Sequence, residues 1–414
     1  MRTGERIDLP TADIPFARTE VSPEAKEAVG RVLTSGWLTT GPEVVEFERE
    51  FAEAVSAPDA VAVSSCTAAI ELSLRALRLP PGSRVLASTM TFCGAVNAIV
   101  HAGLRPVLVD VDPETLMPNA ATTAEAVSRA GGVDAMTVIH FAGHPAPVEE
   151  MADAARLPLD LVVEDAAHAF GTVRGGRPVG SASTATCFSF YATKNLPIGE
   201  GGMVTTARQE IAEFVRRARL HGMSRDAWRR YLPGSGWRYT VETPGLKANL
   251  TDIQAAIGRA QLPRFPEWQE RRRHLVHRYD AGLKDVEGIA VPARPEEDSG
   301  EEVHAWHLYV IRVLPSFGID RDTLMALLTE RGIGCSVHFI PVHHMPYAVE
   351  MDGNGTGTDR FPSADAVFPQ ILSLPLYPSL LDSDVDRVCA TIADVRLPAA
   401  RPLPPPFPSQ GGVA

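Results

Sequence analysis

The sequence has little cysteine, and its cysteines are not arranged as in a disulfide framework or a zinc site. It holds 5 cysteines among 414 residues, and no two of them form a C-x-x-C pair. An odd number of widely spaced cysteines favours reduced thiols, mostly in the core, as in a protein of the cytoplasm. These residues are Cys66, Cys93, Cys187, Cys335 and Cys389.

Long apolar runs are missing as well. Residues 1–8 contain no apolar signal core, and no later apolar run is long enough to cross a bilayer. Acidic residues outnumber basic ones, and the net charge of -12 is unfavourable for binding nucleic acid or an anionic membrane surface. We therefore expect a cytoplasmic protein that is neither exported nor anchored and that binds neither nucleic acid nor membrane.

What the sequence does contain is the pattern of an α/β protein. With 45% hydrophobic residues, a chain of this length can bury a large core and is expected to form two domains. From about residue 60, short β-branched runs alternate with helical patterns, which is typical of a parallel sheet with helices on both faces. Each run ends in a polar residue or a turn, where such sheets place their ligands. The runs are residues 60–63, 84–87, 106–109, 136–139 and 161–163.

Helical patterns frame this region and indicate how the chain is divided. Residues 22–24, Ser-Pro-Glu, predict the start of a helix that ends near Gly36. A long helical segment over 251–283, interrupted by Pro263 and Pro266, is expected to lead to the second domain. Further helices are expected at 43–56, 68–79, 207–220 and 321–331, and a strand at 306–313. The predicted parts are an N-terminal segment (1–35), a large domain (36–265), a small C-terminal domain (266–396) and a disordered Pro-rich tail (397–414).

The stretch from Cys187 to Asn195 has the features of a covalent cofactor site. Lys194 follows a short aromatic strand, hydroxyl groups stand one and five residues before it, and a glycine-rich turn follows at 199–202. A lysine amine becomes a nucleophile toward an aldehyde when burial or nearby positive charge lowers its pKa. Pyridoxal phosphate (PLP) is the common partner, and it needs a carboxylate, groups that hold a phosphate, and a flat group on its ring face. On this stretch alone, an exposed lysine at the mouth of a loop is the alternative.

Four other places supply these groups, although each also has a purely structural explanation. The pair Glu164 and Asp165 at a strand end would place one carboxylate on a pyridine nitrogen, or would cap the next helix. Residues 65–67, at a strand-to-helix junction, offer free amides and a hydroxyl to a phosphate, as any helix cap does. Phe92 either stacks on a flat ring or packs in the core, and Asn249 stands among the caps of a helix. No structural explanation predicts all four together with the lysine.

The same residues form part of motifs that are specific in combination. From about residue 12 to residue 396, the sequence resembles the DegT/DnrJ/StrS family of PLP-dependent sugar aminotransferases. This resemblance implies an α/β protein with the fold of the type I PLP-dependent transferases. It implies a large domain with a seven-stranded mixed sheet, a smaller α+β C-terminal domain, and a homodimer with active sites at the interface. The motifs are residues 35–42, 64–69, 164–167, 187–195, 199–202, 249–256 and 371–378.

The resemblance also implies roles for the residues around the cofactor ring. Lys194 holds the cofactor covalently and later moves a proton between the amino carbon and the cofactor carbon. Asp165 pairs with the pyridine nitrogen, and His168 stands near the 3-hydroxyl group. Phe92 occupies the position that stacks on the ring. A branch of sugar 3-dehydrases has histidine at the lysine position, so the presence of Lys194 disfavours that branch.

For the cofactor phosphate, the resemblance implies Thr67, the backbone amide of Cys66, and Ser189, with Asn249 reaching in from the partner subunit. Many members of the family have glycine at the position of Cys66, and a small residue there still lets the backbone approach a phosphate. We therefore expect pyridoxal 5'-phosphate as the cofactor.

The family's usual reaction moves an amino group from L-glutamate to a ketone of a nucleotide-linked sugar and releases 2-oxoglutarate. Several motifs look most like those of members that act on 4-keto sugars. We therefore expect a nucleotide-linked 4-keto-6-deoxyhexose as the acceptor and a 4-amino sugar nucleotide as the product. The motifs are residues 36–41, 221–228, 244–249 and 337–343.

Contacts with the substrate follow from the same interpretation. His338 and His343 would meet the sugar, while Lys247 and Arg229 would bind the diphosphate by charge-assisted hydrogen bonds. Three neighbouring histidines also suggest a metal, but no carboxylate or thiolate at ligand spacing joins them, so we expect none. They are His338, His343 and His344. Ordinary packing is a further explanation for His304, His307 and His344.

Other functions stay open on the sequence. An aminotransferase that acts on a keto-cyclitol or a 3-keto sugar would have the same cofactor site. A non-catalytic PLP-binding protein with a regulatory role is a second alternative, since a fold does not fix a function. The complete set of Lys194, Asp165, Ser189 and Thr67 argues against the regulatory protein, because a decayed enzyme is expected to have lost one of them.

Overall fold

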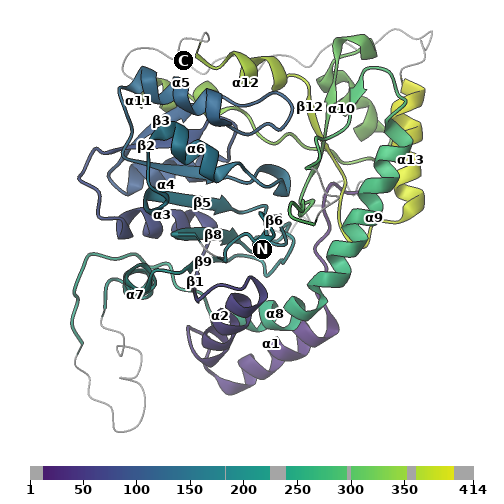
Figure 1. Cartoon of the computed structure of the whole chain (residues 1–414). Helices are drawn as coiled ribbons and strands as arrows, with labels where there is room; N and C mark the ends of the chain where they lie inside the picture. The colour runs from purple at the N-terminus through teal and green to yellow at the C-terminus, as the bar shows by residue number, and fades with distance from the viewer. Residues whose placement is uncertain (1–12, 182, 224–238, 296–299, 352–359, 396–414) are drawn as a thin grey trace, which may run out of the picture.

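The computed structural model describes residues 13–181, 183–223, 239–295, 300–351 and 360–395. Arg229 and the tail expected at 397–414 lie outside the described residues. Within these ranges the chain forms a large sheet covered by helices and a second, smaller sheet beside it (Figure 1).

The large sheet has seven strands in the order β1-β9-β8-β5-β4-β2-β3. β9 pairs antiparallel with β1 and β8, whereas the other pairs are parallel, so every strand of this sheet except β9 runs in one direction. The predicted mixed sheet is therefore confirmed. The strands are β1 (Asp59–Val63), β2 (Arg84–Ser88), β3 (Arg105–Val109), β4 (Ala135–Ile139), β5 (Val162–Ala166), β8 (Ala185–Ser189) and β9 (Gly202–Thr206).

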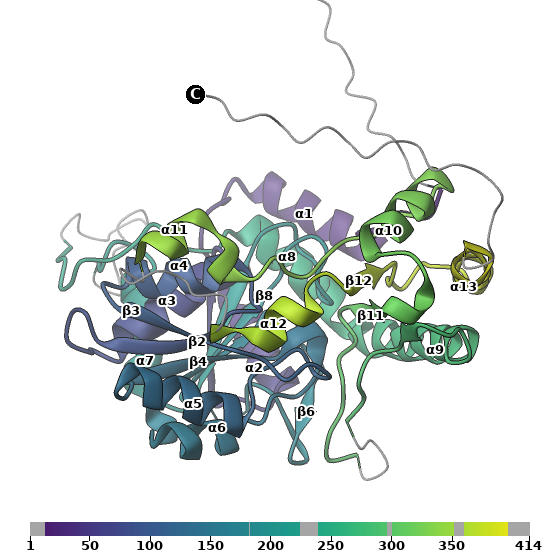
Figure 2. The same cartoon turned by 90° about the horizontal axis from the view of Figure 1, so that it is seen from above.

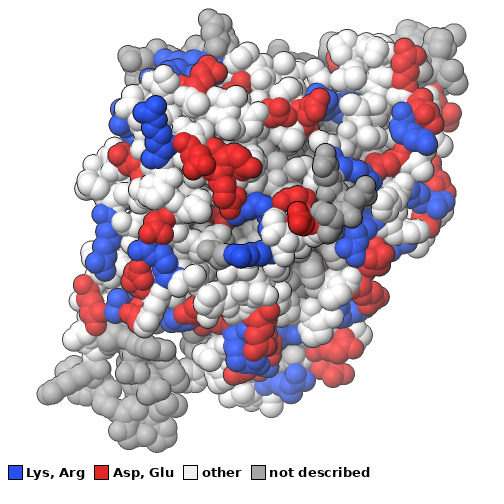
Figure 3. Space-filling view, in the orientation of Figure 1, with Lys and Arg blue, Asp and Glu red and all other residues white. Residues whose placement is uncertain are grey.

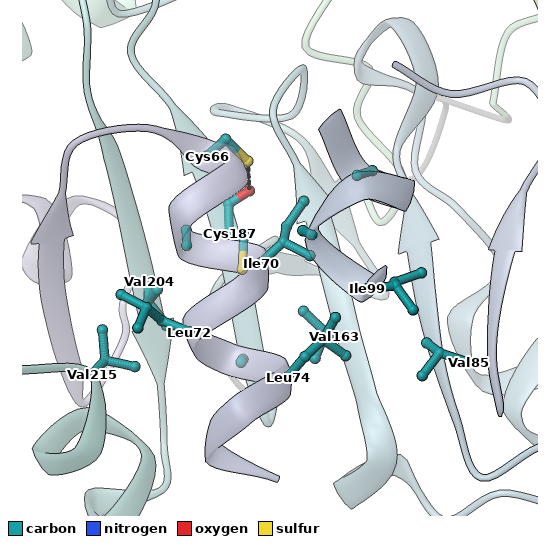
Figure 4. Packing of buried hydrophobic residues seen from close by; sticks show 14 of the residues in the cluster. Cys66, Ile70, Leu72, Leu74, Val85, Ile99, Val163, Cys187, Val204 and Val215 are labelled. Carbon is teal, nitrogen blue, oxygen red and sulfur yellow. Dashed lines mark hydrogen bonds between the residues drawn. The ribbon is translucent and has the colours of Figure 1, made fainter. Parts of the chain in front are cut away.

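Alternation along the strands explains why both faces of this sheet are apolar. In β8, Cys187 joins the hydrophobic cluster on one face, and Phe188 joins the cluster on the other. Val163 of β5 lies on the same face as Cys187, beneath helix α3 (Cys66–Ala76), as Figure 4 shows. All five cysteines are described, and all are free thiols.

Helices cover both faces of the large sheet (Figure 2). On one face, α3 packs with α4 (Cys93–His101) and α7 (Gln209–Ala218). On the other face lie α5 (Ala120–Ala130) and α6 (Val148–Ala155), and α2 (Pro42–Ala54) and α8 (Asp252–Gln261) pack against β1, β8 and β9. The predicted arrangement of an α/β sheet between helices is confirmed.

Helix α1 (Pro23–Ser35) begins and ends where its caps predict. The Ser22 side chain accepts a hydrogen bond from the Ala25 amide at 3.1 Å, and Gly36 ends the helix with a left-handed φ of 74°. Ala28 and Val32 on the buried side of α1 pack against Ala256 of α8. The helix is therefore held by packing as well as by its caps.

The long helical segment is divided more sharply than expected. Pro263 lies in a 3₁₀ turn, η4 (Leu262–Arg264), which separates α8 from α9 (Phe265–Leu283). Because proline has no amide hydrogen, the turn breaks the helical hydrogen bonds at this point. α9 then leads to the second sheet, which has the antiparallel order β10-β11-β12. Its strands are β10 (Ile289–Ala290), β11 (Tyr309–Val313) and β12 (Ile371–Leu374).

The second sheet has a hydrophobic core of its own. Side chains of α9, α10 (Arg321–Glu330) and α13 (Asp382–Val395) pack against its strands, and Ile14 from the start of the described chain joins them. Figure 1 shows α9 and α13 side by side beyond this sheet. The domain boundary at residue 265 stays a prediction. The remaining elements are β6 (Val173–Arg174), β7 (Arg177–Pro178), α11 (Pro346–Met351), α12 (Pro362–Val367), η1 (Phe141–Gly143), η2 (Leu159–Leu161), η6 (Pro315–Phe317) and η7 (Val342–His344).

Two expectations for this part of the chain need correction. The strand predicted at 306–313 begins at Tyr309, because Trp306 has a positive φ of 48° that no strand residue adopts. The sequence also favours a solvated helix face for the basic run at 271–274, with a phosphate-binding patch as the alternative. Instead, Arg272 is buried and donates to the carbonyl oxygens of Trp306 and Leu376.

The surface mixes charges of both signs. Figure 3 shows blue and red side chains interspersed over the face seen in Figure 1. In the part of the chain that the structure describes, no helix is both long and apolar enough to span a membrane.

Candidate active site

A cavity of about 500 Å³ lies at the edge where the parallel strands of the large sheet end. Its size is in the range of small-molecule sites. Lys194 and most of the residues predicted to surround a cofactor line it. The predicted residues in the wall are Cys66, Thr67, Phe92, Asp165, His168, Ser189, Lys194 and His338.

Strand order explains why these residues meet. Asp165 stands near the end of β5, and Ser189 ends the adjacent parallel strand β8. The chain leaving β1 runs directly into α3, whose first residues are Cys66 and Thr67. Because all these strands end at one edge, residues separated by more than 100 positions in sequence share one cavity wall.

Lys194 lies in the turn that joins β8 to β9. Phe188 and Phe190 anchor the start of this turn, since both rings are buried against Phe47 and Phe51 of α2. The Lys194 amide donates to the Tyr191 carbonyl oxygen at 2.8 Å, which closes a tight turn. The side chain is thereby directed into the cavity from a fixed backbone.

The environment of Lys194 suits a nucleophilic amine. Burial lowers the pKa of Lys194 to about 8, although the thiol of Cys66 and the carboxylate of Asp165 act in the opposite direction. The amine is therefore neutral in a substantial fraction of molecules near pH 8, as attack on an aldehyde requires.

Asp165 offers a carboxylate oxygen to a cationic ligand. The carboxylate is buried, and its Oδ1 accepts a hydrogen bond from the Ala167 amide at 3.1 Å and lies 3.7 Å from Cys66 Sγ. No group among the described residues bonds to Oδ2. Burial raises the pKa of Asp165, and a protonated ring nitrogen on Oδ2 would compensate for that cost. The carboxylate thus fits the pyridine nitrogen of PLP.

The start of α3 forms a corner that fits a phosphate. The Ser65 side chain caps the helix by accepting from the Ala68 amide at 3.1 Å, so the first amides of α3 face the cavity corner. The Thr67 hydroxyl has no hydrogen-bonding partner in the described ranges, and Ser189 lines the same cavity. A Cβ on Gly202 would lie 2.5 Å from the Ser65 carbonyl carbon, so only glycine lets β9 pass so close.

Aromatic and imidazole rings flank the space between Asp165 and this corner. Phe92 is 57% exposed at the cavity mouth, and its ring centroid lies 6.0 Å from that of Phe339. Phe339 in turn stacks on His168 at 5.8 Å. The Ala142 amide donates to His168 Nδ1 at 3.2 Å, so the imidazole proton is on Nε2, and burial keeps the pKa of His168 well below its usual value. His168 is therefore a neutral donor.

Among the wall residues that were not predicted as part of the site, His307 and Phe339 contact predicted ones. His307 Nε2 lies 3.4 Å from Lys194 Nζ, although packing was one explanation given for this histidine. Phe339 lies between the rings of Phe92 and His168. Only His307 had a signal in the sequence. It is a histidine within the apolar run that leads into β11, and a buried polar residue needs a hydrogen-bonding partner.

Of the described residues predicted to contact the substrate, only His338 lines the cavity. His338 bonds through Nδ1 to the Ser373 hydroxyl at 2.9 Å, and burial lowers its pKa to about 4. Lys247 and Asn249 bond to each other and do not line the cavity of their own chain. Arg229 lies outside the described residues.

His343 is also outside the cavity wall, with both ring nitrogens engaged. Nδ1 bonds to the Thr89 hydroxyl at 2.6 Å, and Nε2 bonds to Asp365 at 2.9 Å. The same Asp365 oxygen bonds to His344 at 2.7 Å. No carboxylate stands at ligand spacing in the sequence, but the fold brings the distant Asp365 to His343 and His344, and these three residues could hold a metal ion. The expectation that there is no metal stays a prediction. The substrate contact of His343 stays a prediction.

Comparison with known proteins places this geometry among sugar aminotransferases. The model of the DegT/DnrJ/EryC1/StrS aminotransferase family matches residues 19–393. The chain is 42% identical over 384 residues to the spore coat polysaccharide biosynthesis protein SpsC of Bacillus subtilis strain 168, covering 92% of this chain and 97% of that protein.

Solved structures agree. Spr1654 of Streptococcus pneumoniae, in a form with pyridoxamine phosphate (PMP), superposes with a TM-score of 0.83 and 30% identity, covering 93% of this chain and 99% of that one. A PLP form of the same protein is also similar. The sugar aminotransferase CalS13 of Micromonospora echinospora superposes with a TM-score of 0.80 and 29% identity, covering 92% and 99% of the two chains.

Proposed function

The chain belongs to the DegT/DnrJ/EryC1/StrS aminotransferase family, and we propose that it transfers an amino group from L-glutamate to a nucleotide-linked 4-keto-6-deoxyhexose. It is a PLP-dependent sugar aminotransferase. The products of the proposed reaction are a 4-amino sugar nucleotide and 2-oxoglutarate. When bound, PLP supplies an aldehyde that receives the amino group and a ring that withdraws electrons from the reacting carbon.

One observation carries the proposal: Lys194, Asp165 and the α3 corner line a single cavity. We assign Lys194 to hold the cofactor and to move the proton at the reacting carbon through Nζ, since its lowered pKa allows both tasks near neutral pH. Asp165 would keep a proton on the pyridine nitrogen through its free Oδ2.

The other cavity residues bind and orient. Thr67, the Cys66 amide and Ser189 would hold the phosphate, with the partial positive charge of the α3 N-terminus behind them. His168 would donate from Nε2 to the 3-hydroxyl oxygen, because its Nδ1 is already occupied by the Ala142 amide. Phe92 would cover one face of the ring.

The sugar acceptor is supported by sequence motifs and by a relative. The residues at 36–41, 221–228, 244–249 and 337–343 look most like those of enzymes acting on 4-keto sugars. SpsC, by its name, serves the synthesis of a coat polysaccharide, in keeping with an amino sugar product. In the proposed complex, His338 and His343 meet the sugar, and Lys247 and Arg229 meet the diphosphate.

We also propose that two copies of the chain form a dimer that completes each site. Phe92 and Tyr191 line the cavity and yet are 57% and 46% exposed, which leaves the mouth open to a second copy. Asn249 and Lys247, which do not line the cavity of their own chain, would reach the phosphates in the partner's cavity.

The function is tested in two half-reactions. The purified protein is loaded with PLP, and its visible absorption is recorded before and after L-glutamate is added. We expect loss of the visible band and formation of 2-oxoglutarate. The donor is then removed, and nucleotide-linked 4-keto and 3-keto sugars and a keto-cyclitol are supplied in turn, with products identified by mass spectrometry and NMR.

Each outcome distinguishes one alternative. Product from the 4-keto sugar supports the proposal, whereas product from the 3-keto sugar or the keto-cyclitol alone would replace it. A band that glutamate leaves unchanged would indicate another donor or a regulatory protein. The dimer is tested by mixing inactive Lys194→Ala and Asn249→Ala chains, because one site of each mixed dimer then regains both residues. No recovery of activity on mixing would contradict the shared site.

A further inference from the structure

The turn that carries Lys194 also carries Asn195, and both side chains meet the imidazole of His307. His307 Nε2 lies 3.4 Å from Lys194 Nζ, and His307 Nδ1 lies 3.1 Å from Asn195 Oδ1. In the described ranges, His307 is the only hydrogen-bonding partner of this amine, and no carboxylate forms an ion pair with it. His307 is therefore the group that determines where the N–H bonds of Lys194 point.

The proton on His307 can be placed from its neighbours. The Asn195 side chain contacts the Ala305 carbonyl oxygen at 2.8 Å, and a carbonyl oxygen only accepts, so the Asn195 atom there is the amide nitrogen. The other end of the amide is then an oxygen, which accepts the proton on His307 Nδ1. Nε2 consequently bears a lone pair and faces Lys194 as an acceptor.

The imidazole is rigidly held. His307 and Asn195 are 6% and 4% exposed. The His307 amide donates to the Ala142 carbonyl oxygen at 2.8 Å, and the Ala142 amide donates to His168, so one short turn holds two imidazoles. Their ring centroids lie 4.5 Å apart. A side chain fixed in this way loses little further freedom when it binds the amine, which makes it an effective positioning group.

We propose that His307 orients the Lys194 amine by accepting one of its N–H bonds at Nε2, and that Asn195 is a positioning residue that fixes the imidazole tautomer. With one N–H bond directed at His307, the rotation of the amine is restricted and its lone pair can face the cavity. The imidazole does not take the proton away, because burial and the nearby ammonium group keep the pKa of His307 well below that of Lys194. This inference rests on the proposed role of Lys194 in holding the cofactor.

The pH dependence of Lys194 is set by groups from several elements, which any test must hold constant. Among the described residues, the titratable groups that face it come from α3, from β5 and the turn after it, from the β8–β9 turn, from the chain before β11, and from the segment between α10 and η7. They are Cys66, Asp165, His168, Tyr191, Glu200, His307 and His338, with Arg272 beyond His307. Changing His307 to an uncharged amide adds no charge to this set.

Two amide substitutions separate the bond to Lys194 from the bond to Asn195. In His307→Gln, the amide oxygen reaches about as far as Nε2 and can still accept from Lys194. In His307→Asn, the shorter amide replaces the Nδ1 end and leaves Lys194 without its acceptor. Both variants are polar and smaller than histidine, so each serves as the packing control for the other.

The measurement uses the full-length chain freed of cofactor. The rate at which it captures PLP is followed by absorbance between about pH 6 and about pH 10. This range includes the ordinary pKa of histidine and the lowered pKa of Lys194. Borohydride trapping followed by peptide mass spectrometry shows whether capture occurs on Lys194. Circular dichroism and thermal unfolding check that each variant is folded.

We expect capture by the wild-type chain to rise as the pH passes about 8. At the high-pH end, where the amine is neutral, His307→Gln should stay within about threefold of the wild-type rate. There His307→Asn should fall about tenfold, because the neutral amine has lost the hydrogen bond that orients it. The midpoint of His307→Asn should also move to lower pH, because the ammonium form has lost an acceptor. A merely structural defect would lower the rate without moving the midpoint.

Equal capture rates and midpoints in the two variants would overturn the inference. Asn195→Leu provides an independent test if either variant fails to fold, since it keeps His307 but frees its tautomer, and it should also slow capture. If the wild-type chain does not capture PLP on Lys194 at all, the proposed function fails instead. The two failures are therefore distinguishable.

Discussion

Glu164 and Asp165 are consecutive residues of β5 whose carboxylates point to opposite faces of the sheet. Asp165 faces the cavity, whereas Glu164 is bonded to His140 at 2.7 Å and to Arg174 at 3.1 Å. Burial alone would raise the pKa of Glu164, but the bonds from His140 and Arg174 outweigh it and lower that pKa. The two adjacent acids therefore have different surroundings, since one faces the cavity and the other is bonded to basic side chains inside the protein.

Asp165→Asn is expected to reduce turnover by at least about 10²-fold, because an amide cannot stabilise a proton on the cofactor nitrogen. The free energy of unfolding of the cofactor-free chain should not fall, since the cost of burial outweighs the attraction of the Lys194 ammonium group and raises the pKa of Asp165. Steady-state kinetics and urea denaturation measure the two effects. Near-normal turnover would remove Asp165 from the pyridine nitrogen.

Glu164→Gln is the matched control and should show the opposite pattern. Losing a buried ionic partner is expected to lower the free energy of unfolding by roughly 3 kcal/mol, with turnover per folded molecule largely kept. The pKa of Glu164 is lowered in the folded chain, so its contribution is complete above pH 4.5 and is lost as the pH falls below that value. The stability difference between wild type and Glu164→Gln should therefore shrink in acid.

Lys194→Ala should abolish turnover, by at least about 10³-fold, while the chain stays folded. Lys284→Ala removes an exposed lysine at the end of α9 and should leave turnover unchanged. Single-turnover assays with L-glutamate compare the two variants. Substantial residual transamination in Lys194→Ala would show that another group moves the proton.

Lys194→Met should stabilise the cofactor-free chain near neutral pH by roughly 1–3 kcal/mol. The pKa of Lys194 falls from 10.5 to about 8 on folding, so below about pH 8 the folded chain bears the cost of a buried ammonium group. Between about pH 8 and 10.5 the unfolded chain holds a proton that the folded chain has released, so wild-type stability rises with pH. Urea denaturation at pH values below and within this window should show the advantage of methionine shrinking as the pH rises.

Gly202→Ala should lower the free energy of unfolding by about 1–3 kcal/mol and weaken PLP binding, because the new Cβ would collide with the backbone of Ser65 and Cys66. Gly30→Ala is the control, since Gly30 lies in α1 with no atom near its Cβ position. That substitution should be neutral or stabilising by about 0.5–1 kcal/mol, because alanine favours a helix. Thermal unfolding and PLP titration would compare the two glycines.

The sequence predicted the parts of the site that follow strand ends. Strand ends and helix starts can be recognised from the hydrophobic pattern of the sequence. Near such points of the large sheet stand Lys194, Asp165, Ser189 and Thr67. Because parallel strands all end at the same edge of the sheet, residues at their ends lie close together whatever the rest of the fold. The resemblance to a known family added the role of each residue to this placement.

Residues from the second sheet could not be assigned in the same way. His307 meets Lys194 across 113 positions, a contact that depends on how the two sheets dock. The engagement of His343 by Asp365 likewise depends on the return of the chain through α12. Nothing in the local pattern around either histidine distinguishes a packed ring from a site residue. The expectation that His343 faces the substrate therefore rested on its motif alone.

The cavity wall combines Cys66 and Asp165 beside the large sheet with Leu374 and Leu376 beside the smaller one. A folding intermediate with both sheets formed but not docked would leave Lys194 in water, with the slow reactivity of a surface lysine. Docking of distant segments comes late in folding, because the loop between them must close first. The time at which Lys194 becomes reactive toward an aldehyde during refolding would therefore report when the two sheets dock.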